Sequence, residues 1–237
     1  MIETMGKEIL GIVGGMGPLA SAEFVKTIYE HSLAEKEQES PRVILCSDPT
    51  FPDRTEALCS GSSDALLAQL NKVLCHLYQQ GASKVVICCV TIHAILPKLP
   101  QRLRAPIISL LDVIFDHIEH LPGKHLLVSS TGTRELRLFE NHPRWGRAQH
   151  KIIMPEADDQ SYIHKRLIYP MKVKRDIQEQ IPLLESLLKK YDADSFIAGC
   201  TEIHMLTKYM SDHSVLRGRC RFIDPLTILA KKLAQKL

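Results

Sequence analysis

Short apolar runs alternate with longer amphipathic segments along the whole chain. The short runs are rich in β-branched residues and end in polar turns, which is typical of buried strands in a parallel sheet. This alternation predicts an α/β fold with mostly parallel sheets. The predicted strands are residues 9–13, 43–46, 85–89, 107–109, 126–129, 151–154 and 195–198. The predicted helices are residues 18–33, 63–80, 92–99, 111–120, 136–141, 177–191 and 225–236.

The two halves of the chain resemble each other. A strand leads into a small-residue turn and a helix at residues 10–17 and again at 126–133, and Cys200 follows Cys89 by 111 residues. A repeat this long predicts two similar domains related by a pseudo-twofold axis, because solenoid repeats span only about 20–50 residues. We expect the active site in the cleft between the two domains. The repeat predicts a boundary near residue 108. The expected first domain is 1–107 plus about 213–237, where the C-terminal addition is implied by a family resemblance rather than by the repeat, and the expected second domain is 108–212.

Composition narrows the class of protein. The formal net charge of +3 is mild, and no Lys/Arg cluster alternates with aromatic residues, so we expect no nucleic-acid partner. No stretch approaches 18 uninterrupted apolar residues, and residues 1–8 hold no apolar signal core, so we expect neither a membrane span nor an export signal. The seven cysteines are odd in number and lack CxxC spacing, which favours reduced thiols in a cytoplasmic protein without a metal site.

Cys89 and Cys200 each lie just after an apolar run, and a threonine follows each within two residues. A single cysteine in such a run is ordinarily a small core residue, but two in matching positions favour a shared role. Inversion at an amino acid α-carbon needs a base on one face and an acid on the other. A thiol, whose ordinary pKa is about 8.5, can do both when nearby donors stabilise the thiolate.

Six short motifs, spread in order over nearly the whole chain, resemble those of the aspartate/glutamate racemase family, the cofactor-independent amino-acid racemases that use two cysteines. The Pro-Asp-Arg-Thr motif is typical of the aspartate racemase branch. The motifs are Gly-Gly-Met-Gly-Pro at 14–18, Pro-Asp-Arg-Thr at 52–55, Cys-Val-Thr-Ile-His at 89–93, Ser-Thr-Gly-Thr at 130–133, Gly-Cys-Thr-Glu at 199–202 and Ile-Asp-Pro at 223–225.

This resemblance implies a racemase of a small acidic amino acid, with aspartate favoured over glutamate. Cys89 and Cys200 would exchange the α-proton without a cofactor. Arg54 would bind a substrate carboxylate through its bidentate guanidinium. Family members are commonly dimers, so a homodimer is expected. The residues expected to bind substrate are Met16, Gly17, Arg54, Thr91, Thr131, Thr133, Thr201, Glu202, Lys172 and Lys174.

Several roles stay open at this point. Thr131 and Thr133 bind the α-carboxylate or merely cap a helix. His93 and Glu202 tune a thiol or orient a turn. Aspartate-specific members carry a substrate-binding lysine after an Ile-Tyr motif, and here either Lys172 or Lys174 fits that position after a shift of one residue. Pro170 should disturb the helix expected there.

Val90 departs from the family pattern, because it stands where asparagine is usual. Valine cannot hold a carboxylate or a developing negative charge. A catalytically weak or inactive relative that binds a small amino acid or dicarboxylate is therefore the alternative function. Cysteine-dependent decarboxylases and isomerases of dicarboxylates would lack or replace one thiol, whereas both are present here. A thiol hydrolase pairing a cysteine with His93 or His204 leaves the second cysteine unexplained.

Overall fold

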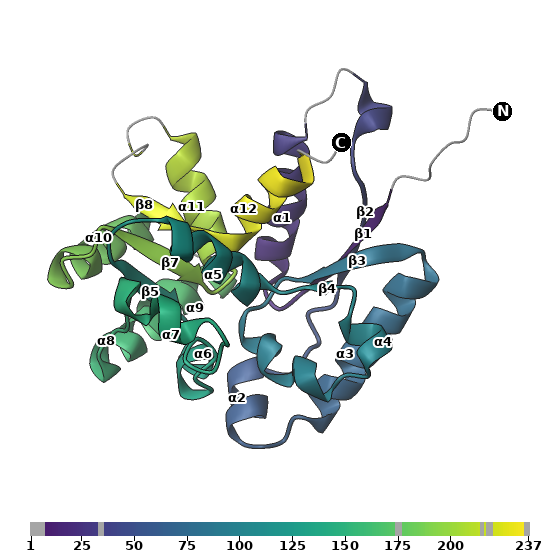
Figure 1. Cartoon of the computed structure of the whole chain (residues 1–237), viewed down its shortest axis with the longest axis horizontal. Helices are drawn as coiled ribbons and strands as arrows, with labels where there is room; N and C mark the ends of the chain where they lie inside the picture. Colours follow the sequence, from purple (N-terminus) through teal and green to yellow (C-terminus); the bar gives the residue numbers. More distant parts are fainter. Residues whose placement is uncertain (1–7, 33–35, 174–176, 214–215, 217–219, 235–237) are drawn as a thin grey trace.

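The computed structural model describes residues 8–32, 36–173, 177–213, 216 and 220–234. These residues form two four-stranded sheets, each with helices packed against it, and the two halves lie side by side (Figure 1). The first sheet has the order β2-β1-β3-β4 and the second has the order β6-β5-β7-β8. All paired strands are parallel. The expected α/β fold with two similar parallel sheets is confirmed.

The two sheets share one topology, so β1 corresponds to β5 and β3 corresponds to β7. This equivalence is the structural form of the internal repeat seen in the sequence. The strands are β1 Ile9–Gly14, β2 Arg42–Ser47, β3 Ala82–Ile87, β4 Ile107–Ile108, β5 His125–Ser129, β6 Ile152–Ile153, β7 Ser195–Gly199 and β8 Arg221–Ile223.

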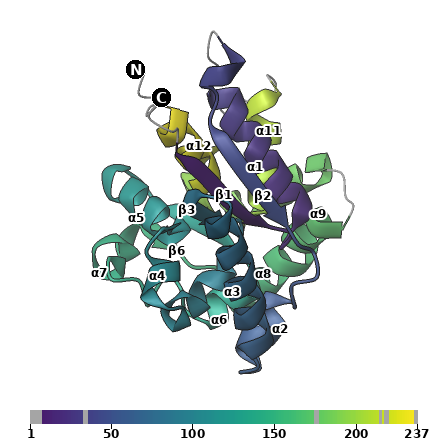
Figure 2. The ribbon, with the colours of Figure 1, turned by 90° about the vertical axis from the view of Figure 1, so that its right-hand side faces the viewer.

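Six helices of ten or more residues cover the sheets. In the first half α1 and α3 lie on opposite faces of the sheet (Figure 2). The long helices are α1 Pro18–His31, α3 Asp64–Gln79, α5 Leu110–His120, α10 Ile181–Lys190, α11 Ile203–Asp212 and α12 Pro225–Ala234. The short α-helices are α2 Arg54–Cys59, α4 Gln101–Arg104, α6 Thr131–Glu135, α7 Trp145–Ala148, α8 Ala157–Tyr162 and α9 Tyr169–Val173. The remaining turns are the 3₁₀ segments Glu37–Glu39, Thr91–Lys98, Gln149–Lys151 and Ile177–Gln180 and the π-helix Ile163–Ile168.

Three apolar clusters form the core. One belongs to the first half and one to the second, while the third joins the halves and includes Ile12 of β1, Phe115 of α5 and Ile197 of β7. Cys88 belongs to the joining cluster and Cys89 to the first-half cluster. The two neighbouring thiols therefore pack on opposite sides of the chain, as alternating strand geometry predicts.

Three elements predicted from the local sequence differ in the structure. The helix expected over 136–141 is wrong: α6 ends at Glu135, and Arg137 adopts a left-handed conformation with φ of 51°, which stops a helix. The segment expected as a helix over 92–99 is a 3₁₀ turn that contains Pro97. The strand expected over 85–89 ends at Ile87, so Cys89 lies in the following turn.

The C-terminal segment connects the two halves. The expected domain division assigned residues 213–237 to the first domain, but β8 pairs with β7 at the edge of the second sheet, where it takes the place that β4 has in the first. The helix α12 that follows packs against α1 and α5. The division into domains stays a prediction. For β8 alone, the pairing shows that the strand belongs to the second sheet and not to the first.

In the part of the chain that is described, no helix is both long and apolar enough to cross a bilayer.

Candidate active site

The candidate residues collect where each sheet reverses its strand order. In an open parallel sheet, the connections leave the carboxyl ends of the two central strands in opposite directions and open a space for a ligand between them. The Gly-Gly-Met-Gly turn follows β1 and the Cys89 turn follows β3. The turn at 130–133 follows β5 and the Cys200 turn follows β7. Four of the six sequence motifs thus occupy the two equivalent positions.

Hydrogen bonds join the two halves at these turns. The Thr201 hydroxyl donates to the carbonyl oxygen of Cys88 at 3.1 Å, so the second cysteine turn is tied to the first. On the other side, the hydroxyl of Thr91 lies 2.9 Å from that of Ser130 and 3.0 Å from that of Thr133. All of these side chains are buried. The two threonines that follow the cysteines therefore hold the halves together.

Cys200 belongs to a buried charged group. Its thiol donates to Glu202 Oε2 at 2.8 Å, and Lys172 Nζ lies 4.0 Å from Glu202 Oε1. Burial, and then the negative charge of Glu202, raises the pKa of Cys200 well above its ordinary value. Cys89 also acts on the Cys200 thiol electrostatically, so the two thiols lie near each other. Cys200 is therefore held as a thiol, in the form of a proton donor.

Lys172 is the lysine that the structure brings to this group. Burial lowers its pKa, but the carboxylate of Glu202 and the thiol of Cys200 outweigh that effect and raise it, so the ammonium stays charged. The chain reaches this point through the π-helix Ile163–Ile168, and Pro170 lies one residue into α9. Pro170 has no N–H to donate to the preceding turn of helix. The π-helix, whose turn is wider than that of an α-helix, ends just before it and lets the chain accommodate the proline. Lys174 lies outside the described residues.

Cys89 is held by its main chain. His93 Nδ1 lies 3.0 Å from the Cys89 carbonyl oxygen, and the backbone N–H of Leu110 donates to His93 Nε2 at 3.1 Å. Because Nε2 accepts, Nδ1 carries the proton and donates to Cys89. Burial lowers the pKa of His93 to about 4, so the ring stays neutral. His93 thus orients the cysteine turn, which is one of its two expected roles.

Arg54 begins α2, next to the turn after β1. Its Nη2 donates to the carbonyl oxygen of Met16 at 3.0 Å and its Nη1 to that of Pro52 at 3.0 Å. The Nε–H is buried and has no acceptor among the residues that the structure describes. A buried donor without a partner costs free energy, and a substrate carboxylate would supply the missing acceptor. The buried Met16 contributes its backbone rather than its side chain.

Gly17 lies against the carboxylate of Glu202. A Cβ at this position would come within 2.7 Å of Glu202 Oε1. The same turn contains Gly15, which adopts φ of +92° with its α-carbon packed against the backbone of Asp48. The glycines therefore allow the first-half turn to approach the second cysteine group.

Two residues to which the sequence analysis assigned no role, Ser130 and His164, hold the turn after β5. Ser130 caps α6 by accepting from the N–H of Thr133 at 3.2 Å, which makes Thr133 a capped position as well as a hydroxyl partner of Thr91. The N–H of Thr131 donates to His164 Nδ1 at 3.1 Å. Nothing in the spacing of the sequence marks His164, because it reaches this turn from the π-helix.

Val90 is almost fully buried and belongs to the apolar cluster that joins the halves. Its side chain offers no hydrogen bond. The next residue, Thr91, has the nearest hydroxyl along the chain, and that hydroxyl contacts those of Ser130 and Thr133.

In the described ranges, no group of three or more His, Cys, Asp or Glu side chains is placed to hold a metal ion.

Comparisons with known proteins identify the family and the fold of the chain. The chain matches the model of the Asp/Glu/Hydantoin racemase family over residues 13–233. Its fold is similar to that of the Picrophilus torridus aspartate racemase, with a TM-score of 0.77 and 23% identity over 96% of this chain and 94% of that one. A putative Asp/Glu racemase from Yersinia pestis gives a TM-score of 0.68 at 21% identity, covering 97% of this chain and 98% of that one.

The glutamate racemase of Francisella tularensis in complex with D-glutamate is also similar, with a TM-score of 0.61 at 17% identity over 98% of this chain and 81% of that one. The family match spans nearly the whole chain and includes both cysteine turns. The chain belongs to the Asp/Glu/Hydantoin racemase family.

Proposed function

We propose that this chain is a PLP-independent racemase of a small acidic amino acid, with aspartate ahead of glutamate, that moves the α-proton between Cys89 and Cys200. The observation that carries the proposal is the meeting of two buried free cysteines at equivalent strand ends of the two halves. They are tied together by the bond from Thr201 to the Cys88 carbonyl. Family membership and the Pro-Asp-Arg-Thr motif support the choice of substrate.

The proton transfers balance between the two sulfurs. With Cys200 held as a thiol, the resting enzyme would use a thiolate at Cys89 as the base. This thiolate removes the α-proton and becomes a thiol, while Cys200 gives its proton to the opposite face of the carbanion and becomes a thiolate. The product is the other enantiomer, and the protonation states of the two sulfurs are reversed. The reverse reaction, or proton exchange with solvent, restores them.

Charge around the sulfurs supports this chemistry. Negative charge develops at the substrate α-carbon and spreads into its carboxylate, and fixed cations beside it lower the barrier. Lys172 and the free Nε–H of Arg54 are the cationic groups near the cysteines. We assign the substrate carboxylates to these two side chains. Glu202 keeps Lys172 in place and accepts a hydrogen bond from the resting Cys200 thiol.

The proposal is tested by α-proton exchange in D₂O, followed by NMR, with both enantiomers of aspartate and of glutamate. Exchange with inversion is expected for aspartate, and Cys89→Ala and Cys200→Ala should each abolish inversion. The matched control is Cys75→Ala, which removes a half-buried thiol outside the site. Binding without exchange would contradict the proposal and favour the alternative of a non-catalytic relative, with Val90 as the reason. A homodimer and a cytoplasmic location stay predictions.

A further inference from the structure

A cavity of about 300 Å³ lies at the opposite end of the second sheet from Cys200. It is lined by His125, Ser195 and Arg221, which are the first residues of β5, β7 and β8. The candidate active site lies at the carboxyl ends of the sheets, beyond Gly199 of β7. This cavity is therefore separate from the cysteines by the length of the strands.

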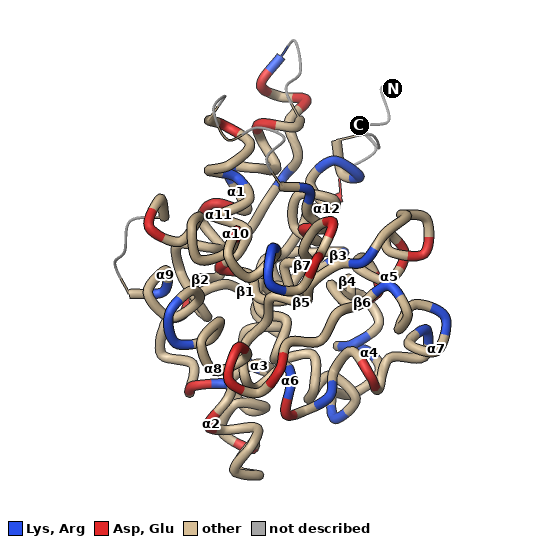
Figure 3. The backbone as a smooth tube through the Cα atoms, turned by 90° about the vertical axis from the view of Figure 1, so that its left-hand side faces the viewer, with Lys and Arg blue, Asp and Glu red and all other residues tan. Residues whose placement is uncertain are grey.

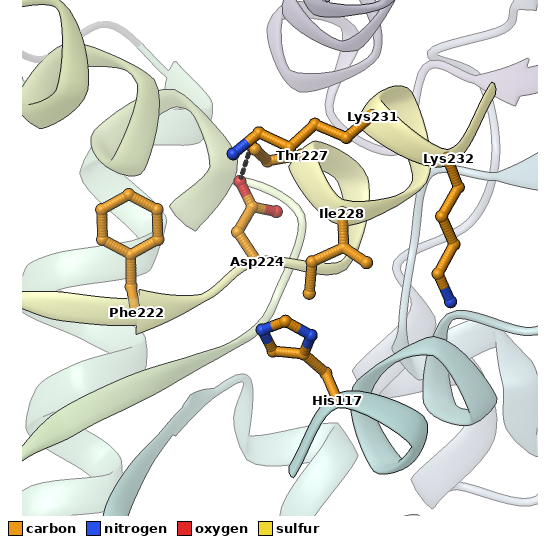
Figure 4. A pocket seen from close by; sticks show the side chains of 7 residues that line it. All are labelled: His117, Phe222, Asp224, Thr227, Ile228, Lys231 and Lys232. Carbon is orange, nitrogen blue, oxygen red and sulfur yellow. Dashed lines mark hydrogen bonds between the residues drawn. The ribbon is translucent and has the colours of Figure 1, made fainter. Parts of the chain in front are cut away.

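A second cavity of about 290 Å³ continues from the first between α5 and α12. The two cavities share His117 and Phe222 in their lining, so they adjoin each other, and we call the two together the groove. In Figure 4, His117 reaches up from α5 and Lys231 and Lys232 extend from α12. The ring of Phe222 points away from them and packs on Phe196. The size of each cavity is near the lower end of what small-molecule sites have.

Positive charge lines this groove. Lys231 and Lys232 form no ion pair with any residue that the structure describes, and Figure 3 shows their basic segment on α12. Asp224 does not neutralise them, because its carboxylate is already engaged by three side chains, among them Thr227, whose bond is drawn in Figure 4. Burial, and then the positive charge of Lys232, lowers the pKa of His117. An anion between these groups would relieve their mutual repulsion.

His125 supplies an independent observation. Its side chain is 2% exposed, and its Nδ1 lies 2.5 Å from the Ser195 hydroxyl. Its Nε2 is buried without any hydrogen-bond partner in the described part of the chain, although His125 lines the first cavity. A buried polar atom without a partner is costly. A ligand in the groove would give this nitrogen the partner that the protein does not.

Apolar surface completes the groove. Ile228 lines it beside the two lysines, and Leu121 lines the cavity that contains His125. We propose that this groove binds a small organic anion, a phosphate or carboxylate attached to an apolar body, with the anionic group at Lys231, Lys232 and His117. The apolar body would pack on Ile228 and extend past Leu121 toward His125.

Phenyl phosphate is the first probe, titrated into the full-length protein and followed by the side-chain imidazole signals of its histidines. Benzoate tests a carboxylate in place of the phosphate, and inorganic phosphate tests the anionic group without the ring. The signals of His117 and His125 are expected to shift with saturation, while that of His164 near the cysteines stays in place. Inorganic phosphate should bind more weakly than phenyl phosphate, because it lacks the apolar contact with Ile228.

A matched pair of variants tests the cations. Lys231→Gln with Lys232→Gln should weaken phenyl phosphate binding about tenfold or more, since charge-assisted contacts are the strong ones. The control is Lys189→Gln with Lys190→Gln, another adjacent lysine pair in the last turn of a helix, which should leave binding unchanged. Equal weakening by both pairs, shifts confined to His164, or no saturable shift with any probe would each overturn the proposal. The binding readout does not depend on racemase activity.

Discussion

At the scale of the residue, the contact between Cys200 and Glu202 defines the chemistry of one thiol. Glu202 is 1% exposed, and its charge acts together with burial to keep Cys200 protonated. The contact fits a proton donor held ready opposite a second cysteine. It also explains why Lys172 is beside the carboxylate, since a buried negative charge needs a compensating partner.

Glu202→Gln removes the negative charge and keeps the shape. The pKa of Cys200 should fall, because the charge that raises it is gone, so alkylation of Cys200 by iodoacetamide near neutral pH should speed up. Racemisation should slow by about 10²–10⁴-fold, the usual contribution of a positioned acid–base group. Mass spectrometry measures the rate of alkylation and exchange in D₂O measures the rate of racemisation, each in an enzyme that keeps Cys89. Glu156→Gln, on an exposed glutamate, should change neither, and an unaltered alkylation rate for Glu202→Gln would contradict this account.

His93 makes folding stability depend on pH. Its pKa is about 4 in the folded protein because of burial, against about 6.5 in an unfolded chain. Since the folded pKa is the lower one, the unfolded state takes up the proton first as pH falls. The free energy of unfolding should therefore drop by roughly 3 kcal/mol between about pH 6.5 and pH 4 from this residue.

His93→Gln keeps a donor and an acceptor in place of the imidazole, so the variant should lose that part of the pH dependence. Urea unfolding at several pH values measures the difference from the unmodified protein. His120→Gln, at an exposed position on α5, serves as the control and should keep the full dependence. Parallel pH profiles for the protein and His93→Gln would show that His93 is not held neutral by burial.

At the scale of the element, the turn after β1 acts as a spacer between the halves. Gly17 permits the close approach of this turn to Glu202, and Arg54 of α2 binds the same turn through the Met16 carbonyl. The short helix α2 also packs against α6 of the second half. These elements are brief because contacts across the halves, rather than their own hydrogen bonds, hold them in place.

Gly17→Ala should impair catalysis and leave the fold intact. Gly17 has φ of −113°, which alanine adopts readily, so no backbone strain arises. The new Cβ would meet Glu202 Oε1 at 2.7 Å and push the carboxylate away from Cys200. We expect the exchange rate to fall about tenfold or more, the effect of one lost hydrogen bond to a charged group. Thermal unfolding should change little.

The control for this prediction is Gly146→Ala, because nothing lies within 4 Å of a Cβ there. It should leave the exchange rate unchanged. Equal rates for the two alanine variants would mean that the contact between Gly17 and Glu202 does not matter for the reaction.

At the scale of the whole molecule, a buried contact between His204 and Asp224 ties the C-terminal segment to both halves. His204 Nδ1 donates to Asp224 Oδ2 at 2.6 Å, and His204 Nε2 lies 3.0 Å from the Thr27 hydroxyl. The imidazole is therefore held by a hydrogen-bond partner on each side. The pair connects α1, α11 and the start of α12.

Asp224→Asn should destabilise the molecule strongly. It replaces a buried carboxylate that accepts from His204, Thr207 and Thr227, and breaking a buried pair from one side costs about 3–5 kcal/mol. The free energy of unfolding in urea measures this loss. Asp212→Asn removes a half-exposed carboxylate that pairs with Lys208 and should cost less than about 1 kcal/mol. Similar losses in the two variants would show that the buried carboxylate of Asp224 contributes no more than a half-exposed one.

The sequence by itself determined the α/β class, the internal repeat and the pairing of Cys89 with Cys200. Strands buried on both faces require continuous apolar runs, and those runs can be recognised without any partner. The positions of both cysteines just after such runs then follow from local pattern alone. The resemblance of two contiguous motifs to the aspartate/glutamate racemase family is what predicted Arg54 and the glycine turn as part of the site.

Only the tertiary structure decided the rest. The contact of Glu202 with Cys200, the place of Lys172, the part played by His164 and the pairing of β8 with β7 depend on which segments pack together. So do the short helices and the stop at Arg137, since brief helices take their stability from packing rather than from propensity. Side-chain period and composition carry no record of such contacts, which join residues from separate elements.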